Sequence, residues 1–199
     1  EFAEILVKEF KADVDVKLKK SHGRSSVAKK GTTPLLLACR TGDIAYAKLL
    51  HKLGADVKAT NENGTNALLA AVGAGSKTPS EEPGTEDEAI ELASWLMGQG
   101  LDINIVNRRG DTIMHSVAYR NFPKVAEFLH SKGADIKVWN KKNKSGSTPL
   151  LIAQGIRPGN FKPDEQTTIA FEKIMRAEGL EPPAAPERPL IGKKKGYQQ

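Results

Sequence analysis

Apolar residues recur along the chain at helical spacing, in pairs of short segments. The first segment of a pair is a run of small and aliphatic residues, most clearly PLLLACR after Thr33 and PLLIA after Thr148. The second has apolar residues three and four positions apart and ends at a glycine, as in AKLLHKLG and VAEFLHSKG. Each pair therefore predicts a helix–turn–helix unit, and polar stretches rich in Gly, Asn and Asp separate the units.

The pairs are copies of one another. Four of them open on a glycine followed by Thr, Asp or Ser, at Gly31, Gly64, Gly110 and Gly146, with intervals of 33, 46 and 36 residues. The excess in the second unit lies between its two helices, in GAGSKTPSEEPGTEDE, whose Gly, Pro, Ser and carboxylates are typical of a solvated loop. A period of this length predicts a solenoid, in which stacking of neighbouring units buries the apolar faces.

The residues at the ends of the helices fit this interpretation. Thr33 and Thr148 are good N-caps, and each precedes a proline at the first helical position. Glycines at 54, 100 and 133 follow the second helices, where a left-handed backbone is expected. Small residues at Ala38, Cys39, Ala71, Ala118 and Ala153 would let neighbouring helices approach closely.

The motifs G-T-T-P-L-L-L-A, G-S-T-P-L-L-I-A and the two Gly-Ala-Asp elements strongly resemble ankyrin repeats. The resemblance extends from Phe2 to about Leu180, nearly the whole chain. It implies an all-α solenoid of stacked helix–turn–helix units, with β-hairpin-like fingers between repeats and a concave face lined by the first helices. The histidine usual in the motif stands only at His115, and its other three places hold leucine at 36, 69 and 151.

The repeats divide the chain into six parts. We expect a partial N-terminal repeat with a long basic finger at 1–30, repeats at 31–63, 64–109 (with the acidic inter-helix insert) and 110–145, a C-terminal capping repeat at 146–180, and a Pro-rich basic tail at 181–199.

The sequence gives little support for a catalytic or metal-binding site. The histidines are His22, His51, His115 and His130, and no H-x-x-H, HExxH, Walker or GxGxxG pattern occurs. Cys39, the one cysteine, occupies a small-residue core position. The carboxylates between Glu81 and Glu88 are interpreted as a solvated loop. We therefore expect no enzyme activity, cofactor or metal.

The charge pattern says more about function than the histidines and the cysteine do. The net charge is +6 and the isoelectric point is about 9.3, and basic residues concentrate where the resemblance places fingers and the concave face. The candidate partner-binding residues at these places are Lys29, Lys30, Arg40, Thr41, Glu62, Asn63, Arg108, Arg109, Asp111, Tyr119, Arg120 and Trp139. We expect the centre of the surface to consist of Arg108, Arg109, Tyr119, Arg120 and Trp139, because these residue types dominate interface energetics.

The resemblance and the charge together predict a non-catalytic scaffold or adaptor that binds a protein with an acidic or polar surface. An alternative is a permanent structural subunit or self-assembling component clamped by its tail, and homo-oligomerisation is left open. Nucleic acid is a remote alternative, because the chain has no recognisable nucleic-acid-binding motif or aromatic stacking platform.

The prediction of the cellular compartment depends on weaker sequence signals than the prediction of the fold. No apolar run reaches the length of a membrane span. The start lacks an initiator Met and a signal-peptide pattern, and is interpreted as processed or truncated. The closing unit, with RPGNFKPDEQT, resembles the ending of bacterial exported ankyrin proteins. This resemblance implies a bacterial periplasmic or secreted protein, with the cytoplasm as the alternative.

Overall fold

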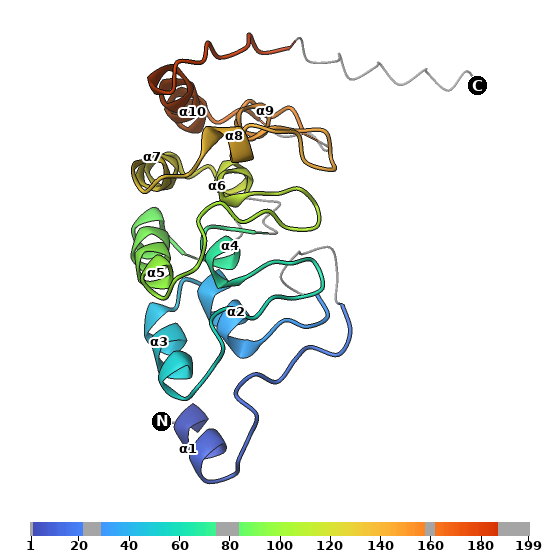
Figure 1. Cartoon of the computed structure of the whole chain (residues 1–199), viewed down its shortest axis with the longest axis vertical. Helices are drawn as coiled ribbons and strands as arrows, with labels where there is room; N and C mark the ends of the chain where they lie inside the picture. Colours follow the sequence, from blue (N-terminus) through green and yellow to red (C-terminus); the bar gives the residue numbers. More distant parts are fainter. Residues whose placement is uncertain (1, 22–28, 75–83, 158–161, 187–199) are drawn as a thin grey trace, which may run out of the picture.

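The helices stand in two parallel columns, as Figure 1 shows for this computed structural model. It describes residues 2–21, 29–74, 84–157 and 162–186. The inner column consists of α2 (Pro34–Arg40), α4 (Ala67–Ala71), α6 (Ile113–Arg120) and α9 (Pro149–Ala153). The outer column consists of α1 (Phe2–Lys8), α3 (Ile44–Lys52), α5 (Glu86–Gly98), α7 (Pro123–Ser131) and α10 (Glu165–Ala177). The predicted all-α solenoid is confirmed.

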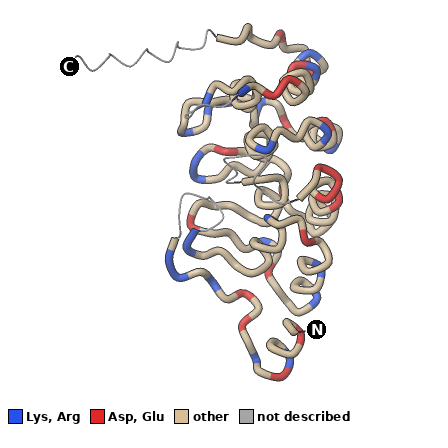
Figure 2. Tube along the Cα trace, turned by 180° about the vertical axis from the view of Figure 1, so that it is seen from behind, with Lys and Arg blue, Asp and Glu red and all other residues tan. Residues whose placement is uncertain are grey.

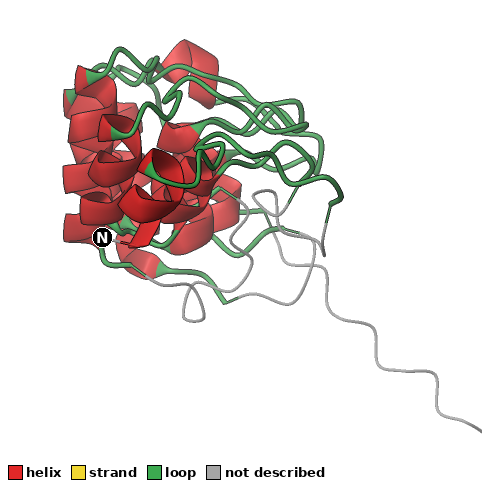
Figure 3. Ribbon diagram, turned by 90° about the horizontal axis from the view of Figure 1, so that it is seen from below, coloured by secondary structure: helices red, strands yellow, loops and turns green. Residues whose placement is uncertain are grey.

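The loops between repeats project from one side of the columns, away from the outer helices (Figure 3). The described residues contain no strand, only a single antiparallel bridge between Val106 and Thr112. One further helix, the four-residue α8 (Ile136–Trp139), lies at the start of the last such loop. We call these loops fingers.

The inner helices begin where the caps predict. The Thr33 hydroxyl accepts a hydrogen bond from the amide of Leu36 at 3.4 Å, and that of Thr148 from Leu151 at 3.3 Å. Both threonines precede a proline in the first turn. At the other ends of the units, Gly54, Gly100 and Gly133 have φ of 100°, 82° and 94°. The predicted left-handed closure of the outer helices is therefore confirmed.

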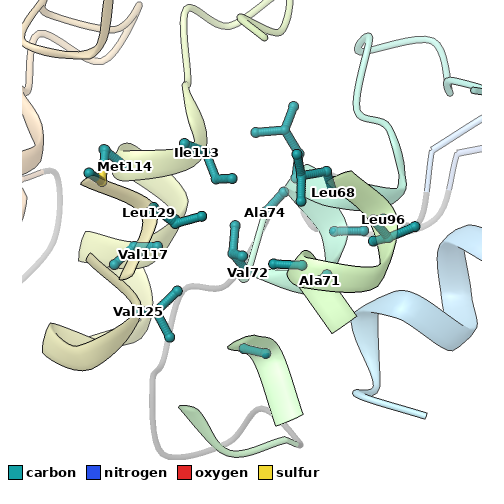
Figure 4. Close-up of a cluster of buried hydrophobic side chains, with 14 of the residues drawn as sticks. Leu68, Ala71, Val72, Ala74, Leu96, Ile113, Met114, Val117, Val125 and Leu129 are labelled. Atoms are coloured by element: carbon teal, nitrogen blue, oxygen red, sulfur yellow. The ribbon is translucent and has the colours of Figure 1, made fainter. Parts of the chain in front are cut away.

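The core lies between successive units. Figure 4 shows one such contact, where Leu68 and Leu96 of the second repeat stand opposite Ile113 and Val117 of the third, with Val72 between them. All five side chains are buried. Full burial of such a side chain contributes about 1.5–3 kcal/mol, so the stacking of one unit on the next stabilises both.

The end of the acidic insert is built into the fold. Thr85 and Glu88 form a capping box at the start of α5. The Glu86 carboxylate accepts hydrogen bonds from the amides of Lys124 and Val125 at 2.6 and 3.1 Å, in the first turn of α7. Helix α7 needs this acceptor because its own N-cap residue is a phenylalanine that forms no side-chain cap. The prediction of a solvated loop is wrong for this part, and Glu81 and Glu82 lie outside the described residues.

The two ends of the array differ from its middle. Helix α1 contains no buried residue, and Phe2 is 73% exposed. Beyond α10, residues 181–186 run past the last repeat, where Pro182 and Pro186 line a groove together with Ile169 and Arg176 of α10. The rest of the predicted basic tail, 187–199, lies outside the described residues, as do residues 22–28 of the basic first finger, including His22.

Candidate protein-binding surface

Each of the three later fingers is closed by an asparagine at an equivalent position, three residues before the glycine that opens the next repeat. The Asn61 side-chain oxygen accepts hydrogen bonds from the amides of Asn63 and Thr65 at 3.0 and 3.2 Å. Asn107 and Asn143 repeat this pair of bonds in their own fingers. One side chain thus holds each turn in a fixed shape. These asparagines were absent from the predicted set, although their recurrence at one offset was a usable signal.

The fingers are joined to one another by main-chain hydrogen bonds. The amides of Glu62, Arg108 and Lys144 each donate to a carbonyl of the preceding finger, at Lys30, Asn63 and Arg109 respectively, and each bond is 2.8 Å long. This ladder sets the tips in one row. We call their residues the finger row, which comprises Lys29, Lys30, Glu62, Asn63, Arg108, Arg109, Lys144 and Ser145.

Positive charge dominates the finger row. Figure 2 shows Lys and Arg at the loop tips, on the side away from the outer helices. Arg108 and Lys144 are exposed, and Arg109 is half exposed in a long contact of 3.6 Å with Asp111. Glu62 is the acid of the row, and its carboxylate accepts a hydrogen bond from the Ser21 hydroxyl. Lys144 was not among the predicted contact residues, although it stands at the same offset from its glycine as Arg108.

Two predicted contact residues belong to a polar network between the third and fourth repeats. The Asn143 side-chain amide donates to the Asp111 carboxylate at 2.7 Å and to the Tyr119 hydroxyl at 3.2 Å. The Arg157 guanidinium lies 5.1 Å from the centre of the Tyr119 ring. Burial is the main cause that raises the pKa of the Tyr119 phenol. Asp111 is buried and Tyr119 partly so, so of these two only Tyr119 has an edge that a partner could reach.

The predicted contact role of Arg120 is wrong, because its side chain is only 5% exposed. The guanidinium donates to the Gly84 carbonyl at 2.9 Å and stacks 4.4 Å from the centre of the Phe122 ring. Its methylene stem crosses Gly73, where an added Cβ would lie 2.1 Å from the Arg120 Cγ. Arg120 therefore holds together the two ends of the insert in the preceding repeat.

The predicted contact role of Trp139 is also wrong. The residue closes α8 and is 1% exposed. Its indole nitrogen donates to the Ala134 carbonyl at 3.2 Å, and its ring packs at 5.7 Å, between centroids, on Phe171 of α10. The loop that follows the third repeat's outer helix thus starts with a turn of helix, α8, in which Ile136 and Trp139 both enter the core. The finger proper follows it.

The remaining predicted residues are accessible to different extents. Thr41 is exposed and Arg40 partly exposed at the end of α2. The Thr41 hydroxyl donates to the carbonyls of Leu37 and Ala38 within its own helix. Partner contact by these residues, and by the members of the finger row, stays a prediction.

The side chains of His115 and Cys39 lie in the core. His115 is buried, with Nε2 lying 3.0 Å from the Lys141 carbonyl and 3.2 Å from that of Ser147. Because both neighbours are acceptors, this nitrogen donates, and Nδ1 accepts from the Thr112 amide. Burial lowers the pKa of His115 and raises the pKa of the Cys39 thiol to about 12. Among the described residues, no group of three His, Cys, Asp or Glu is placed to hold a metal ion.

Comparison with known proteins agrees with the fold. A family model for three copies of ankyrin repeats matches residues 1–78, and a model for many copies matches residues 86–130. The two ranges together cover more than half of the chain, and the chain belongs to the ankyrin-repeat family. Repeats of this family generally mediate protein–protein interaction and are typically non-catalytic.

One curated relative is the mouse B-cell lymphoma 3 protein homolog, which is 27% identical over 129 residues. The match covers 64% of this chain and 25% of the relative, so the chain spans about a quarter of that protein's length. No helix in the described part is long and apolar enough to cross a bilayer.

Proposed function

We propose that this protein is a non-catalytic scaffold that binds an acidic or polar protein surface through its finger row and the adjoining concave face. The observation that carries the proposal is the main-chain ladder that fixes the finger tips. It presents Arg108, Arg109 and Lys144 side by side. A surface ordered before binding loses less conformational entropy when a partner arrives, so more of the contact energy appears as affinity.

The chemistry of the row supports an acidic partner. Arginine is enriched at interfaces, and its planar guanidinium can donate hydrogen bonds to both oxygens of a carboxylate at once. A line of like charges also speeds encounter with a partner of opposite charge and disfavours basic partners. With Arg120 and Trp139 removed from the predicted set, the proposed centre is Arg108, Arg109 and Lys144, with the edge of Tyr119 beside them.

The test begins with pull-down from the source organism and mass spectrometry to identify the partner. Retention of the purified partner is then compared for Arg108→Glu with Lys144→Glu, and for Lys52→Glu with Lys132→Glu as control. Both double variants change the net charge equally, but the control lysines lie on the outer column. We expect affinity to fall about tenfold or more for the finger variant only. Equal retention of both variants at low salt would refute the proposal.

A further inference from the structure

The phenol of Tyr119, at the junction of the third and fourth repeats, has a proton to donate. Its oxygen accepts a hydrogen bond from the side-chain amide of Asn143 at 3.2 Å. A phenol both donates and accepts, and in the part of the chain that the structure describes no acceptor lies within hydrogen-bond distance of the Tyr119 proton. Because the residue is partly exposed, the edge of its ring presents a donor to a group that approaches it.

The guanidinium of Arg109 is a second donor group beside the phenol. Its side chain is 49% exposed, and its Nε lies 3.6 Å from a carboxylate oxygen of Asp111, too far for a hydrogen bond. Asp111 accepts a shorter bond, of 2.7 Å, from Asn143. An exposed ion pair of this length contributes little to stability. Arg109 can therefore leave Asp111 for a better acceptor, and Asp111 keeps its bond from Asn143.

A further cation lies against the Tyr119 ring. The Arg157 guanidinium is 5.1 Å from the centre of that ring. Burial lowers the pKa of Arg157, but an arginine keeps its charge at neutral pH. Burial also raises the pKa of the Tyr119 phenol, and the charges of Arg157 and Arg109 act in the opposite direction. Because such an effect requires proximity, both guanidinium groups lie close to the phenol.

We propose that Arg109, Tyr119 and Arg157 form an anchor site for one oxyanion group, a carboxylate or a phosphate, on a side chain of the protein partner. The Arg109 guanidinium turns from Asp111 and donates to two oxygens of the group, and the Tyr119 hydroxyl donates a further hydrogen bond. Arg157 is a positioning residue, which holds the ring and adds positive potential. The inference rests on the proposed function, because it names the group by which the acidic partner is held beside the finger row.

Charge separates an anion from a neutral acceptor at the anchor site. The carbonyl of a glutamine side chain could also accept from Tyr119, but only a charged acceptor gains fully from the guanidinium groups. Asp111 opposes an incoming anion, since its charge also acts on the phenol. Two guanidinium groups and one carboxylate leave one net positive charge, so an anion is attracted overall.

The probes are three acetylated and amidated pentapeptides, which have glutamate, phosphoserine or glutamine as the central residue between pairs of glycines. They are titrated into the full chain labelled with ¹⁵N, and the Nε–Hε signals of the arginine side chains are followed by NMR. We expect the glutamate or the phosphoserine peptide to shift the signals of Arg109 and Arg157 at least about fivefold more than that of Arg108, and the glutamine peptide to leave them in place. The stronger of the two anionic peptides identifies the group as a carboxylate or a phosphate.

Matched variants locate the donors. Tyr119→Phe removes the hydroxyl and keeps the ring, so affinity for the stronger anionic peptide should fall about three- to tenfold. Tyr46→Phe makes the same change on the outer column, where Tyr46 is 39% exposed, and should have no effect. Arg109→Lys loses the planar contact with two oxygens and should also weaken binding. Its control is Arg108→Lys in the same finger. Circular dichroism checks that each variant is folded.

The role of Arg157 has a separate readout. Its charge lowers the pKa of the Tyr119 phenol, so Arg157→Gln should raise that pKa, measured by ultraviolet titration, and weaken binding of the anionic peptide. Arg176→Gln, at an exposed arginine of α10, should change neither. Weaker binding without a change in the phenol pKa would contradict the position given to Arg157.

Three results with the peptides would overturn the inference: equal shifts of Arg108 and Arg109, binding of the glutamine peptide as strong as that of the anionic peptides, or unchanged affinity in Tyr119→Phe. A larger shift of the same signals by oligothymidylate than by the phosphoserine peptide would assign the site to nucleic acid instead.

The peptide experiment is done without the partner, so the anchor site and the finger row can fail independently. If the peptides do not bind, but Arg108→Glu with Lys144→Glu still abolishes partner retention, only the anchor site is refuted. If the peptides bind as expected and that double variant retains the partner, the anchor site stands and the proposed role of the finger row is refuted.

Discussion

The side-chain amide of Asn143 donates a 2.7 Å hydrogen bond to the carboxylate of Asp111, which joins the fingers of two successive repeats. The same asparagine closes its own finger through its side-chain oxygen. One residue thus fixes both the shape of a finger and its place against the finger before it. It adds to the link that His115 makes between the same two repeats through the carbonyls of Lys141 and Ser147.

Replacing Asn143 by aspartate separates these two roles. The turn keeps its acceptor, but the donor to Asp111 is lost and two carboxylates face each other, so we expect a loss of about 1–3 kcal/mol in the free energy of unfolding at pH 7. Urea unfolding measures it. Asn61→Asp is the control, because there the side chain faces the Thr32 hydroxyl, which can donate to a carboxylate. Equal losses in the two variants would contradict the role given to Asp111.

Removing the carboxylate of Glu86 should destabilise the start of α7. In Glu86→Ala the amides of Lys124 and Val125 lose their acceptor, and a lost helix cap costs about 0.5–2 kcal/mol. Amide hydrogen exchange should show faster exchange at these two residues. Asp87→Ala removes an exposed acid from the same turn of α5, so it controls for the effect on α5 itself. Similar exchange at Lys124 in both variants would rule out the cap.

His115 should make the array less stable in acid. Burial lowers its folded-state pKa below the unfolded value of about 6.5. The unfolded chain therefore binds the proton more readily, and stability rises with pH through this window and is lost as pH falls below about 6.5. His115→Leu copies the residue of the other three repeats. We expect a flatter stability profile between pH 5 and 7, measured by urea unfolding.

The same variant should be less stable at pH 8 than the parent protein. Leucine leaves the Lys141 carbonyl without its donor, at a cost of about 1–3 kcal/mol. A pH profile parallel to that of the parent would show that another group causes the acid sensitivity.

Trp139→Ala tests the corrected role of this residue. Because its ring is buried against Phe171, truncation should cost about 3–5 kcal/mol in the free energy of unfolding. Lys137→Ala, in the same short helix but exposed, should change it by less than about 0.5 kcal/mol. Thermal unfolding followed by circular dichroism compares the two. If Trp139→Ala changed the free energy of unfolding only slightly but abolished partner binding, Trp139 would be a partner-contact residue after all.

Features set by neighbours in sequence were predictable, and features set by contacts between repeats were not. The caps at Thr33 and Thr148 depend on residues within one turn, so the pattern of the chain suffices to find them. The burial of Trp139 depends on Phe171 in the next repeat, and that of Arg120 on Gly73 and Gly84 in the preceding one. Residue type and offset suggested exposed contacts at both places, and packing decided otherwise. The compartment stays a prediction, because no residue of the fold reports on it.

The position of Arg120 has a consequence for how the chain tolerates change. It ties Gly73 to Gly84 across the base of the insert, so the distance between these two glycines is set from outside the segment that joins them. We therefore expect a change of length between Gly73 and Gly84 to leave the register of the helices unaltered. The second repeat is thus a natural insertion point, at which a foreign loop could be displayed on an unchanged stack.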